Sequence, residues 1–473
     1  MELGLSYDDV LLIPQRSPIK SRKDVSTETF LTKNIKLKIP IVSSNMDTVT
    51  EADMAIALAD LGGIGIIHRF NTTMQQVKEV EKVKRHRNAI IENPLWTTPE
   101  KTLAEAKEIM KKHDVTSLLV LDDSKRLIGI LTSRDYWFDP SENIPIYKLM
   151  TPKKRLIVAK NRIQIEKAKQ IMMKHKIEKL PLINDDWTVA GLVTGRDIHN
   201  KTRFPNSTLD SKHSLRVGAA IGVKEDALDR AKALIKAGAD LLVIDIAHGH
   251  SDIEIEVLKR LKSSFPKTEV MAGNVATADG TRDLIKAGAD CVKVGVGPGS
   301  ICTTRIVTGA GYPQLSAILS CAKEGAKYGI PIIADGGIKQ SGDITKAIAA
   351  GASSVMLGSL LAGTDESPGT PILKNGGKYK VVRGMASFGA KLGRDAKSKS
   401  DSDISDFVPE GVEATVPYRG SVIDIINQLV GGFRSGMSYC GARTIKDLKG
   451  RGEFIQITQA GVRESKSHDV NVA

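Results

Sequence analysis

The chain is short of cysteine, of aromatic side chains and of long apolar runs, and each shortage excludes a class of protein. Its 473 residues include four cysteines, none in a CxxC pair, which argues against a disulfide scaffold and favours a reducing, cytoplasmic setting. Aromatic residues make up 4%, too few for the stacking of nucleic-acid bases on aromatic side chains to be the main mode of binding. We therefore interpret the net charge of +13 as a solvated basic surface that suits small anionic ligands rather than nucleic acid. No run approaches about 18 apolar residues, and the N-terminus has no basic stretch followed by an apolar block, so we expect neither a membrane span nor a signal peptide.

Eight short apolar runs recur along the chain, with helix-like segments between several of them. They occupy residues 38–47, 62–69, 215–222, 240–249, 269–277, 290–299, 330–337 and 353–359. Segments such as 227–240 and 281–290 contain a glycine that leads into the next run, as a helix C-cap does. This alternation indicates parallel βαβ units, and eight units predict an α/β fold of the (β/α)8 TIM-barrel type, whose chemistry lies at the C-terminal ends of the strands.

An internal repeat interrupts this alternation. The segment 108–135 is followed by a similar segment at 170–197, and Gly129 and Gly191, 62 residues apart, hold the same place in the two copies. Each copy indicates a helix, a strand, a turn, a second strand and the motif T-x-R-D. We therefore expect two half-domains that bury a shared face, inserted between barrel strands two and three. The predicted domains are a barrel at 1–92 and 205–473 and an insert at 93–204.

The stretch GVGPGSICTTR, residues 295–305, places a cysteine between a glycine-rich turn and two threonines at the end of the sixth predicted strand. A lone cysteine is commonly an inert core residue. Here, however, glycine lets a ligand approach the backbone, and the amide groups of a turn can favour a thiolate. Thr303 and Thr304 offer hydroxyl groups close by. We therefore interpret Cys302 as a nucleophile.

Two glycine turns, ADGGI at 334–338 and MLGS at 356–359, end the seventh and eighth predicted strands. TIM barrels often hold a phosphate group between these two loops, where glycine leaves the backbone amides open to an anion. Tight turns alone would also explain the glycines, but their occurrence at these two strands favours a phosphate site. Ser300 and Ser359 would add hydroxyl donors, and Asp335 would accept hydrogen bonds from a ribose diol.

Two further features leave alternatives open. His248 and His250 could begin a zinc site, but no third ligand is evident, and Asp245 at the same strand end could instead bind the hydroxyl groups of a second ligand. The segment from Gly389 to Asp406 is rich in glycine, serine and charge and has no apolar period. It is either a disordered surface loop or a mobile lid, a flap of about 386–415 over the site.

Several long motifs resemble the IMP dehydrogenase/GMP reductase family. They are GVGPGSICTTR, MAGNVAT, IIADGGI, VMLGSLLAGTDESPG and VPEGVEATVPYRG, and the resemblance runs from YDDVLLIPQRS to HDVNVA. The repeat resembles the paired CBS module of many members. The family implies a purine mononucleotide in the barrel mouth with NADPH or NAD beside it, potassium in the dehydrogenase branch, and a homotetramer or octamer. It implies no nucleic-acid or membrane partner.

The resemblance also implies a role for individual residues. The catalytic set is Cys302, which attacks purine C2, and the proton-relaying pair Thr304 and Glu410. The substrate contacts are Ser300, Asp335, Gly337, Gly358, Ser359 and Met385, with Asp335 on the ribose diol and Met385 beside the base. The cofactor contacts are Asp245, Asn274 and Gly295. The carbonyl groups of Gly297, Gly299 and Cys302 match a monovalent-cation site.

The two branches of the family differ in their second half-reaction. The dehydrogenase oxidises IMP with NAD and hydrolyses a covalent thioimidate, using an Arg-Tyr pair on the flap, whereas the reductase removes ammonia from GMP and has no need of that pair. Here Asp395 follows Arg394, the flap has no tyrosine, and Val382 replaces a tyrosine of the dehydrogenases. SNMDTV and GYPQLSA also resemble the reductase, while DIAHGHS, GSLLAGTDESPG and GVRESKSHDV resemble the dehydrogenase. We predict GMP reductase, with IMP dehydrogenase as the alternative.

The insert supports a third hypothesis, a nucleotide-sensing protein with an inactive barrel. The intact set of Cys302, Thr304, Asp335 and Glu410 argues against it. Asp135 and Asp197 end the two T-x-R-D motifs and are the candidates for binding the ribose of adenine or guanine nucleotides. The alternative role for both aspartates is helix capping.

Overall fold

The computed structural model describes residues 2–86, 91, 93–113, 115–138, 141–161, 163–195, 203–392 and 408–467. The chain divides into two compact units. The first comprises Met1–His86, Asn206–Ser211 and Leu215–Ala473, and the second comprises Arg87–Pro205 and Lys212–Ser214. Among the described residues, no helix has the length and apolar character needed to cross a membrane.

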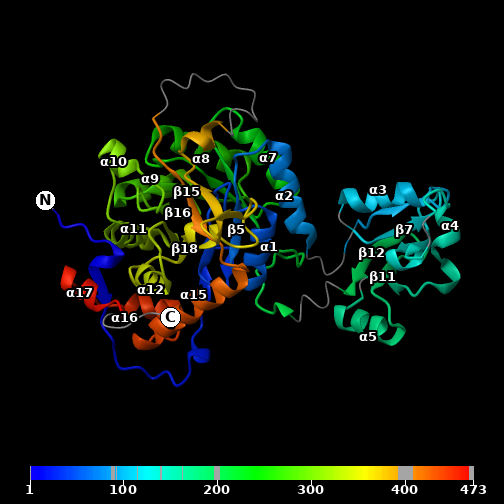
Figure 1. Ribbon diagram of the computed structural model, residues 1–473, viewed down its shortest axis with the longest axis horizontal. Coiled ribbons are helices and arrows are strands. Elements are labelled where there is room, and N and C mark those ends of the chain that lie inside the picture. Colours follow the sequence, from blue (N-terminus) through cyan, green and yellow to red (C-terminus); the bar gives the residue numbers. More distant parts are fainter. Residues whose placement is uncertain are drawn as a thin grey trace. The chain divides into compact units, whose positions relative to one another are not determined.

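The first unit is built on a closed barrel of eight parallel strands (Figure 1). The strands are β4 (Ile41–Ser43), β5 (Ile64–Ile67), β13 (Gly218–Ile221), β14 (Leu241–Ile244), β15 (Glu269–Val275), β16 (Cys291–Val294), β17 (Ile332–Asp335) and β18 (Ser354–Leu357). Each predicted apolar run contains one of them, and β18 pairs with β4 to close the barrel. The predicted TIM barrel is therefore confirmed, and the second unit enters the chain between its second and third strands.

Helices surround the barrel and pack their apolar sides against it. They are α1 (Ala52–Leu61), α2 (Thr73–His86), α7 (Ala227–Ala237), α8 (Asp252–Ser264), α9 (Ala278–Ala287), α11 (Gln314–Tyr328), α12 (Ser341–Ala349) and α15 (Val422–Tyr439). Gly238 and Gly288 end α7 and α9 in the left-handed conformation, as expected for glycine C-caps. Strand residues that face the helices form one large core with them, and a second cluster of strand side chains fills the barrel interior.

Smaller elements complete the first unit. β1 (Val10–Leu12) pairs with β22 (Phe454–Gln456), and β2 (Thr29–Phe30) pairs with β3 (Lys36–Leu37). Next to the barrel lies an antiparallel sheet of β19 (Ile372–Lys374), β20 (Gly377–Arg383) and β21 (Glu413–Pro417). Short helices of the described part include α10 (Thr304–Thr308), α13 (Ser359–Ala362), α16 (Ile445–Arg451) and α17 (Gln459–Glu464).

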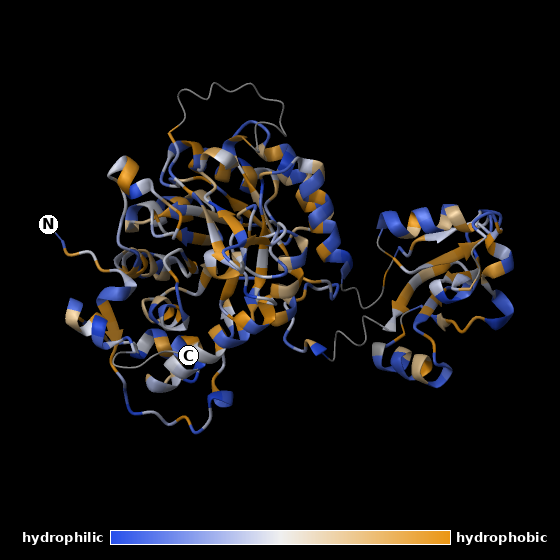
Figure 2. Ribbon diagram, viewed as in Figure 1, coloured by the Kyte–Doolittle hydropathy of each residue, from blue (hydrophilic) through white to orange (hydrophobic). Residues whose placement is uncertain are grey.

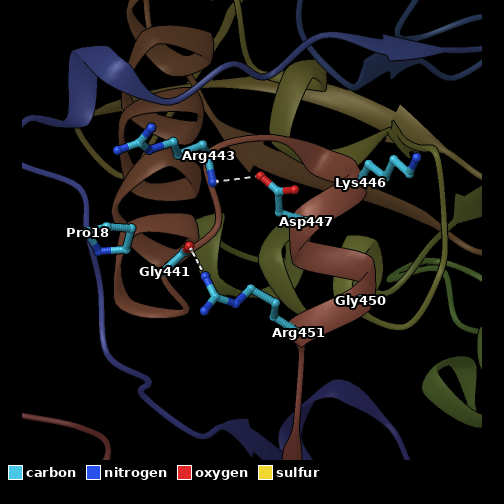
Figure 3. Close-up of a pocket in the computed structure, with 7 residues that line it drawn as sticks. All are labelled: Pro18, Gly441, Arg443, Lys446, Asp447, Gly450 and Arg451. Carbon is cyan, nitrogen blue, oxygen red and sulfur yellow. Dashed lines mark hydrogen bonds between the residues drawn. The ribbon is translucent and has the colours of Figure 1, made fainter.

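An open, mainly basic pocket lies between the end of α15 and α16 (Figure 3). It is lined by Pro18, Gly441, Arg443, Lys446, Asp447, Gly450 and Arg451. Lys449 on α16 donates a hydrogen bond to the Ser353 hydroxyl, and Ser353 immediately precedes β18. The pocket therefore lies towards the end of the barrel where the strands begin, away from the loops in which we expect the chemistry.

The second unit contains two small sheets. One sheet is β6 (Trp96–Thr97), β7 (Ser117–Leu121), β8 (Leu127–Thr132) and β9 (Thr151–Pro152), and the other is β10 (Ala159–Lys160), β11 (Lys179–Ile183) and β12 (Val189–Thr194). Its α-helices within the described residues include α3 (Leu103–His113), α4 (Ile146–Leu149) and α5 (Ile165–His175). Figure 2 shows the apolar residues concentrated in the strands of this unit.

The internal repeat is visible in the backbone of this unit. α5, β11 and β12 begin and end 62 positions after α3, β7 and β8. The irregularities of strand pairing also correspond: the register shifts between Val120 and Leu121 in one hairpin and between Leu182 and Ile183 in the other. The two copies bury a shared apolar cluster, as the repeat predicts; its buried members are Leu119, Leu121, Leu127, Ile130, Ile183 and Leu192.

Candidate active site

The proposed nucleophile lies in the loop that follows β16, at the C-terminal rim of the barrel. The Cys302 thiol donates to the Thr304 hydroxyl at 3.2 Å, and the Thr304 hydroxyl donates to Glu410 Oε2 at 2.8 Å. All three side chains are partly buried. The three predicted catalytic residues, two of them 106 positions apart, thus form one continuous hydrogen-bonded chain. Such a chain can move a proton between the thiol and the carboxylate.

Backbone pairing brings Glu410 to the cysteine loop. The Thr303 amide donates to the Glu410 carbonyl at 2.9 Å, and the Val412 amide donates to the Ile301 carbonyl at 3.0 Å. Cys302 and Gly411 lie opposite each other in this short antiparallel bridge. The position of the carboxylate therefore does not depend on side-chain contacts alone. Of the predicted flap, residues 393–407, including Arg394, lie outside the described residues.

Cys302 differs from the other three cysteines, all of which the structure describes. Cys291, Cys321 and Cys440 are buried, whereas Cys302 is partly accessible. Burial raises the pKa of the Cys291 and Cys440 thiols, and it raises the pKa of Cys321 to about 11. Those three thiols are therefore protonated core groups, and Cys302 is the cysteine with access to a ligand.

Asp335 ends β17 and is held by two neighbouring strands. Its Oδ2 accepts hydrogen bonds from Lys293 Nζ and from Asn274 Nδ2, both at 2.9 Å. Lys293 also donates to Asn274 Oδ1, and Asn274 Nδ2 donates to the Gly295 carbonyl at 2.7 Å. The Lys293 side chain is 4% exposed and that of Asp335 is 23% exposed. Both of these donors bind Asp335 Oδ2. Asp335 Oδ1 has no hydrogen-bond donor among the described residues, so it could accept a hydrogen bond from the diol of a ligand.

The two predicted phosphate loops follow β17 and β18. Gly336 and Gly337 after β17 adopt φ angles of 94° and 80°, which favour glycine. Ser359 begins α13 after β18, next to Gly358. Ser300 is exposed on the cysteine loop and Met385 is partly buried after β20. These residues lie on loops that follow β16, β17, β18 and β20.

Several residues of this rim were not identified from the sequence. A Cβ atom on Gly358 would lie 3.2 Å from both Ser44 Oγ and Met46 Sδ, so the loop after β4 adjoins the β18 turn. On the other side, a Cβ atom on Gly337 would lie 3.3 Å from the buried ring of Tyr7. The sequence offered a signal only for the first pair, because SNMDTV follows an apolar run, whereas Tyr7 lies 330 positions from its neighbour.

The predicted cofactor residues lie at the ends of β14, β15 and β16. Asp245 Oδ2 accepts a hydrogen bond at 2.8 Å from Nε of Arg69, a residue that was not predicted from the sequence. The Asn274 carbonyl accepts from the Gly249 amide at 2.7 Å, which ties the β15 loop to the β14 loop. The Asn274 side chain faces Lys293 and Asp335, so it supports the Asp335 carboxylate.

The remaining site predictions concern ions and regulation. His250 pairs with Asp283 at 3.0 Å, and no group of three or more metal-binding side chains occurs among the described residues. The Gly299 carbonyl accepts a hydrogen bond from the Cys302 amide at 3.2 Å, and Gly297 adopts a φ of 83°.

Asp135 accepts hydrogen bonds from the Thr132 amide and hydroxyl, which is the capping arrangement. Asp197 lies outside the described residues.

Comparison with known proteins identifies the family. The family model described as "IMP dehydrogenase / GMP reductase domain" matches residues 4–468. The chain belongs to the IMP dehydrogenase/GMP reductase family. It is 52% identical over 471 residues to the inosine-5'-monophosphate dehydrogenase of Nitrosopumilus maritimus, covering 99% of this chain and 98% of that protein. It is 51% identical over 479 residues to the GMP reductase of Leishmania major, covering 99% of this chain and 97% of that protein.

A solved structure supports the same assignment. A variant GMP reductase from Trypanosoma brucei, in complex with guanosine 5'-monophosphate, matches with a TM-score of 0.95 at 46% identity, covering 100% of this chain and 99% of that chain. Membership makes this chain an NAD(P)-dependent oxidoreductase of purine metabolism that acts on a purine mononucleotide. The family expected from the sequence motifs is therefore confirmed. Relatives of almost equal identity carry both activities, so the choice between them depends on the residues of this chain.

Proposed function

We propose that this member of the IMP dehydrogenase/GMP reductase family is a GMP reductase, which converts GMP and NADPH to IMP, ammonia and NADP. The observation that carries this proposal is the flap sequence. A dehydrogenase must activate water to hydrolyse its thioimidate, but here Asp395 follows Arg394 and the flap has no tyrosine. A reductase has no hydrolytic step, so it does not require the Arg-Tyr pair.

The hydrogen-bonded chain supports covalent catalysis at purine C2. The Cys302 thiolate would attack C2 of GMP and form a C–S bond. The C2–N bond then breaks, and the amine leaves as ammonia after it is protonated through Thr304 and Glu410, leaving a thioimidate on Cys302. Hydride addition to C2 and cleavage of the C–S bond release IMP and restore the thiolate. When bound, the reduced nicotinamide supplies that hydride.

The residues near Asp245 fit a nicotinamide cofactor. Asp245 is half-buried, and its Oδ1 has no hydrogen-bond donor among the described residues, so it can accept from a ribose hydroxyl. Asn274 and Gly295 line the neighbouring strand ends, and the Asn274 amide donates both to Asp335 Oδ2 and to the Gly295 carbonyl. Ser300, Gly337, Gly358, Ser359 and Met385 are proposed for the nucleotide, with Asp335 on its ribose diol.

IMP dehydrogenase is the second candidate, favoured by the identity of 52% to the Nitrosopumilus enzyme and by the motif DIAHGHS. In that case NAD replaces NADPH, and the carbonyls of Gly297, Gly299 and Cys302 would hold potassium.

A single absorbance assay distinguishes the reductase from the dehydrogenase. GMP with NADPH should lose the reduced-nicotinamide band, and IMP with NAD and potassium should give no gain. A gain only in the second mixture would instead establish the dehydrogenase and require another group to activate water.

We further propose that the second unit is a CBS pair that binds adenine or guanine nucleotides and shifts activity or assembly by differential affinity for two states. Titration of ATP, GTP and their diphosphates into the full chain should give binding heat in calorimetry. Asp135→Ala should weaken that binding, whereas Asp123→Ala, at an exposed turn of the same unit, should not. Absence of heat with all four nucleotides would refute the regulatory role.

We propose a homotetramer, or an octamer if the CBS pairs associate, working in the cytoplasm. The four cysteines support a reducing setting, since none of them forms a disulfide.

A further inference from the structure

Glu254 is a buried carboxyl group that the proposed mechanism does not use. It lies in the first turn of α8 and is 0% exposed. Its Oε1 accepts a hydrogen bond from the Gly273 amide at 2.7 Å, and no described residue hydrogen-bonds its Oε2. A glutamate at this helix position ordinarily reaches back to the N-cap amide or into solvent. Here it points inwards, beneath the rim of the barrel.

Glu254 contacts both loops that carry the proposed cofactor residues. Gly273 directly precedes Asn274 on β15. Gly249 lies four residues after Asp245, and a Cβ atom on it would lie 2.5 Å from Glu254 Oε2, so the glycine leaves the space that the carboxyl group fills. The Gly249 amide in turn donates to the Asn274 carbonyl. One side chain therefore supports the two strand ends together.

Burial and the groups around Glu254 together decide its protonation. Burial is the main cause that raises its pKa, nearby Asp245 adds to the rise, and the Gly273 amide and Lys293 oppose it; together these bring the pKa to about 8. His250 in the same loop pairs with Asp283 on α9. At neutral pH Glu254 is thus a neutral acid, and above about pH 8 it becomes a buried anion near Asp245.

We propose that Glu254 is a positioning residue for the cofactor side of the active site, setting the relative placement of the loops that carry Asp245 and Asn274. The inference rests on the proposed function only in assigning the nicotinamide cofactor to those loops. Ionisation of Glu254 loosens the contact, because a desolvated charge beneath Gly249 and near Asp245 is unfavourable. Cofactor affinity therefore falls as the pH rises through the Glu254 titration, and nucleotide affinity does not.

Binding measurements without turnover test this. NADPH is titrated by its fluorescence into the full chain in the presence of IMP, and IMP affinity is measured separately by calorimetry. Glu254→Ala should weaken NADPH binding at least about tenfold, the loss expected when a buried hydrogen bond is removed, with IMP affinity unchanged within about twofold. Glu254→Gln mimics the neutral acid, so it should bind NADPH like the wild type at pH 7. Between pH 7 and 9 its affinity should stay level while that of the wild type falls.

The matched control is Glu256→Gln, which changes an exposed glutamate on the same helix and should keep the wild-type pH dependence. Parallel losses of NADPH and IMP affinity in Glu254→Ala would overturn the inference, because they would indicate a general structural role. So would an identical pH dependence in the wild type and Glu254→Gln. A wild-type chain that binds neither NADPH nor NAD would refute the proposed function together with this inference, whereas intact binding in every variant would refute the inference alone.

Discussion

Replacing Cys302 with alanine should reduce turnover to less than about a thousandth of the wild-type rate while GMP affinity stays within a few-fold. The thiol is the group proposed to bond C2, and alanine leaves no other thiol in the loop. The Cys302 side chain contributes one hydrogen bond, to Thr304, so its loss should leave the loop and the nucleotide contacts in place. Steady-state rates and calorimetric GMP binding measure the two effects.

Cys321→Ala is the matched control, since Cys321 is a buried core thiol on α11. It should lose some stability but keep its rate per folded molecule. Alkylation gives an independent readout: iodoacetamide should modify the wild type at Cys302 and be slowed by GMP, and Cys302→Ala should resist it. Full turnover in Cys302→Ala would rule out the covalent mechanism, whatever the branch of the family.

The barrel was predictable from the sequence because its signal is local and repeated. Each buried parallel strand is a short apolar run, and the polar or glycine residues that follow it mark the rim. Cys302, Asp335 and the glycine turns were found in this way. Glu410 was not accessible to that reasoning, because its approach to Cys302 depends on a backbone bridge across more than a hundred residues. The family resemblance supplied it, and the geometry agrees with its position.

Charged residues within the barrel and at its rim were the main omission. Lys293, Arg69 and Glu254 each occur among ordinary polar residues, and charged side chains are usually solvated. Only the closed barrel reveals that Lys293 points inwards to Asp335 and that Glu254 lies beneath Gly249. The alternation of residues in the sequence predicts where a strand lies, but it does not predict which charged side chains become buried when the barrel closes. Such groups are identified by burial, and burial here is a property of eight strands together.

Lys293 carries the second large prediction: Lys293→Met should lower both stability and nucleotide affinity. Its ammonium is buried between Asp335 Oδ2 and Asn274 Oδ1. Removing one partner of a fully buried ion pair costs about 3–5 kcal/mol, because the other charge remains without compensation, and the partial exposure of Asp335 places the loss here at the lower end of that range. For a unit of this size that corresponds to a fall in melting temperature of roughly 5–10 °C. The unsupported Asp335 should also raise the KM for GMP at least about tenfold, since a misplaced carboxylate loses charge-assisted hydrogen bonds to the diol.

The exposed Lys286 on α9 offers the control, and Lys286→Met should change neither quantity appreciably. A double variant separates the two effects. Lys293→Met combined with Asp335→Asn removes both charges, so it should recover part of the lost melting temperature, because no buried charge is left unpaired. It should not recover the KM, because the carboxylate that we assign to the ribose diol is gone. Recovery of both would mean that Asp335 matters only as the partner of Lys293, and an unchanged melting temperature in Lys293→Met would mean that water or a neighbouring group replaces the ammonium.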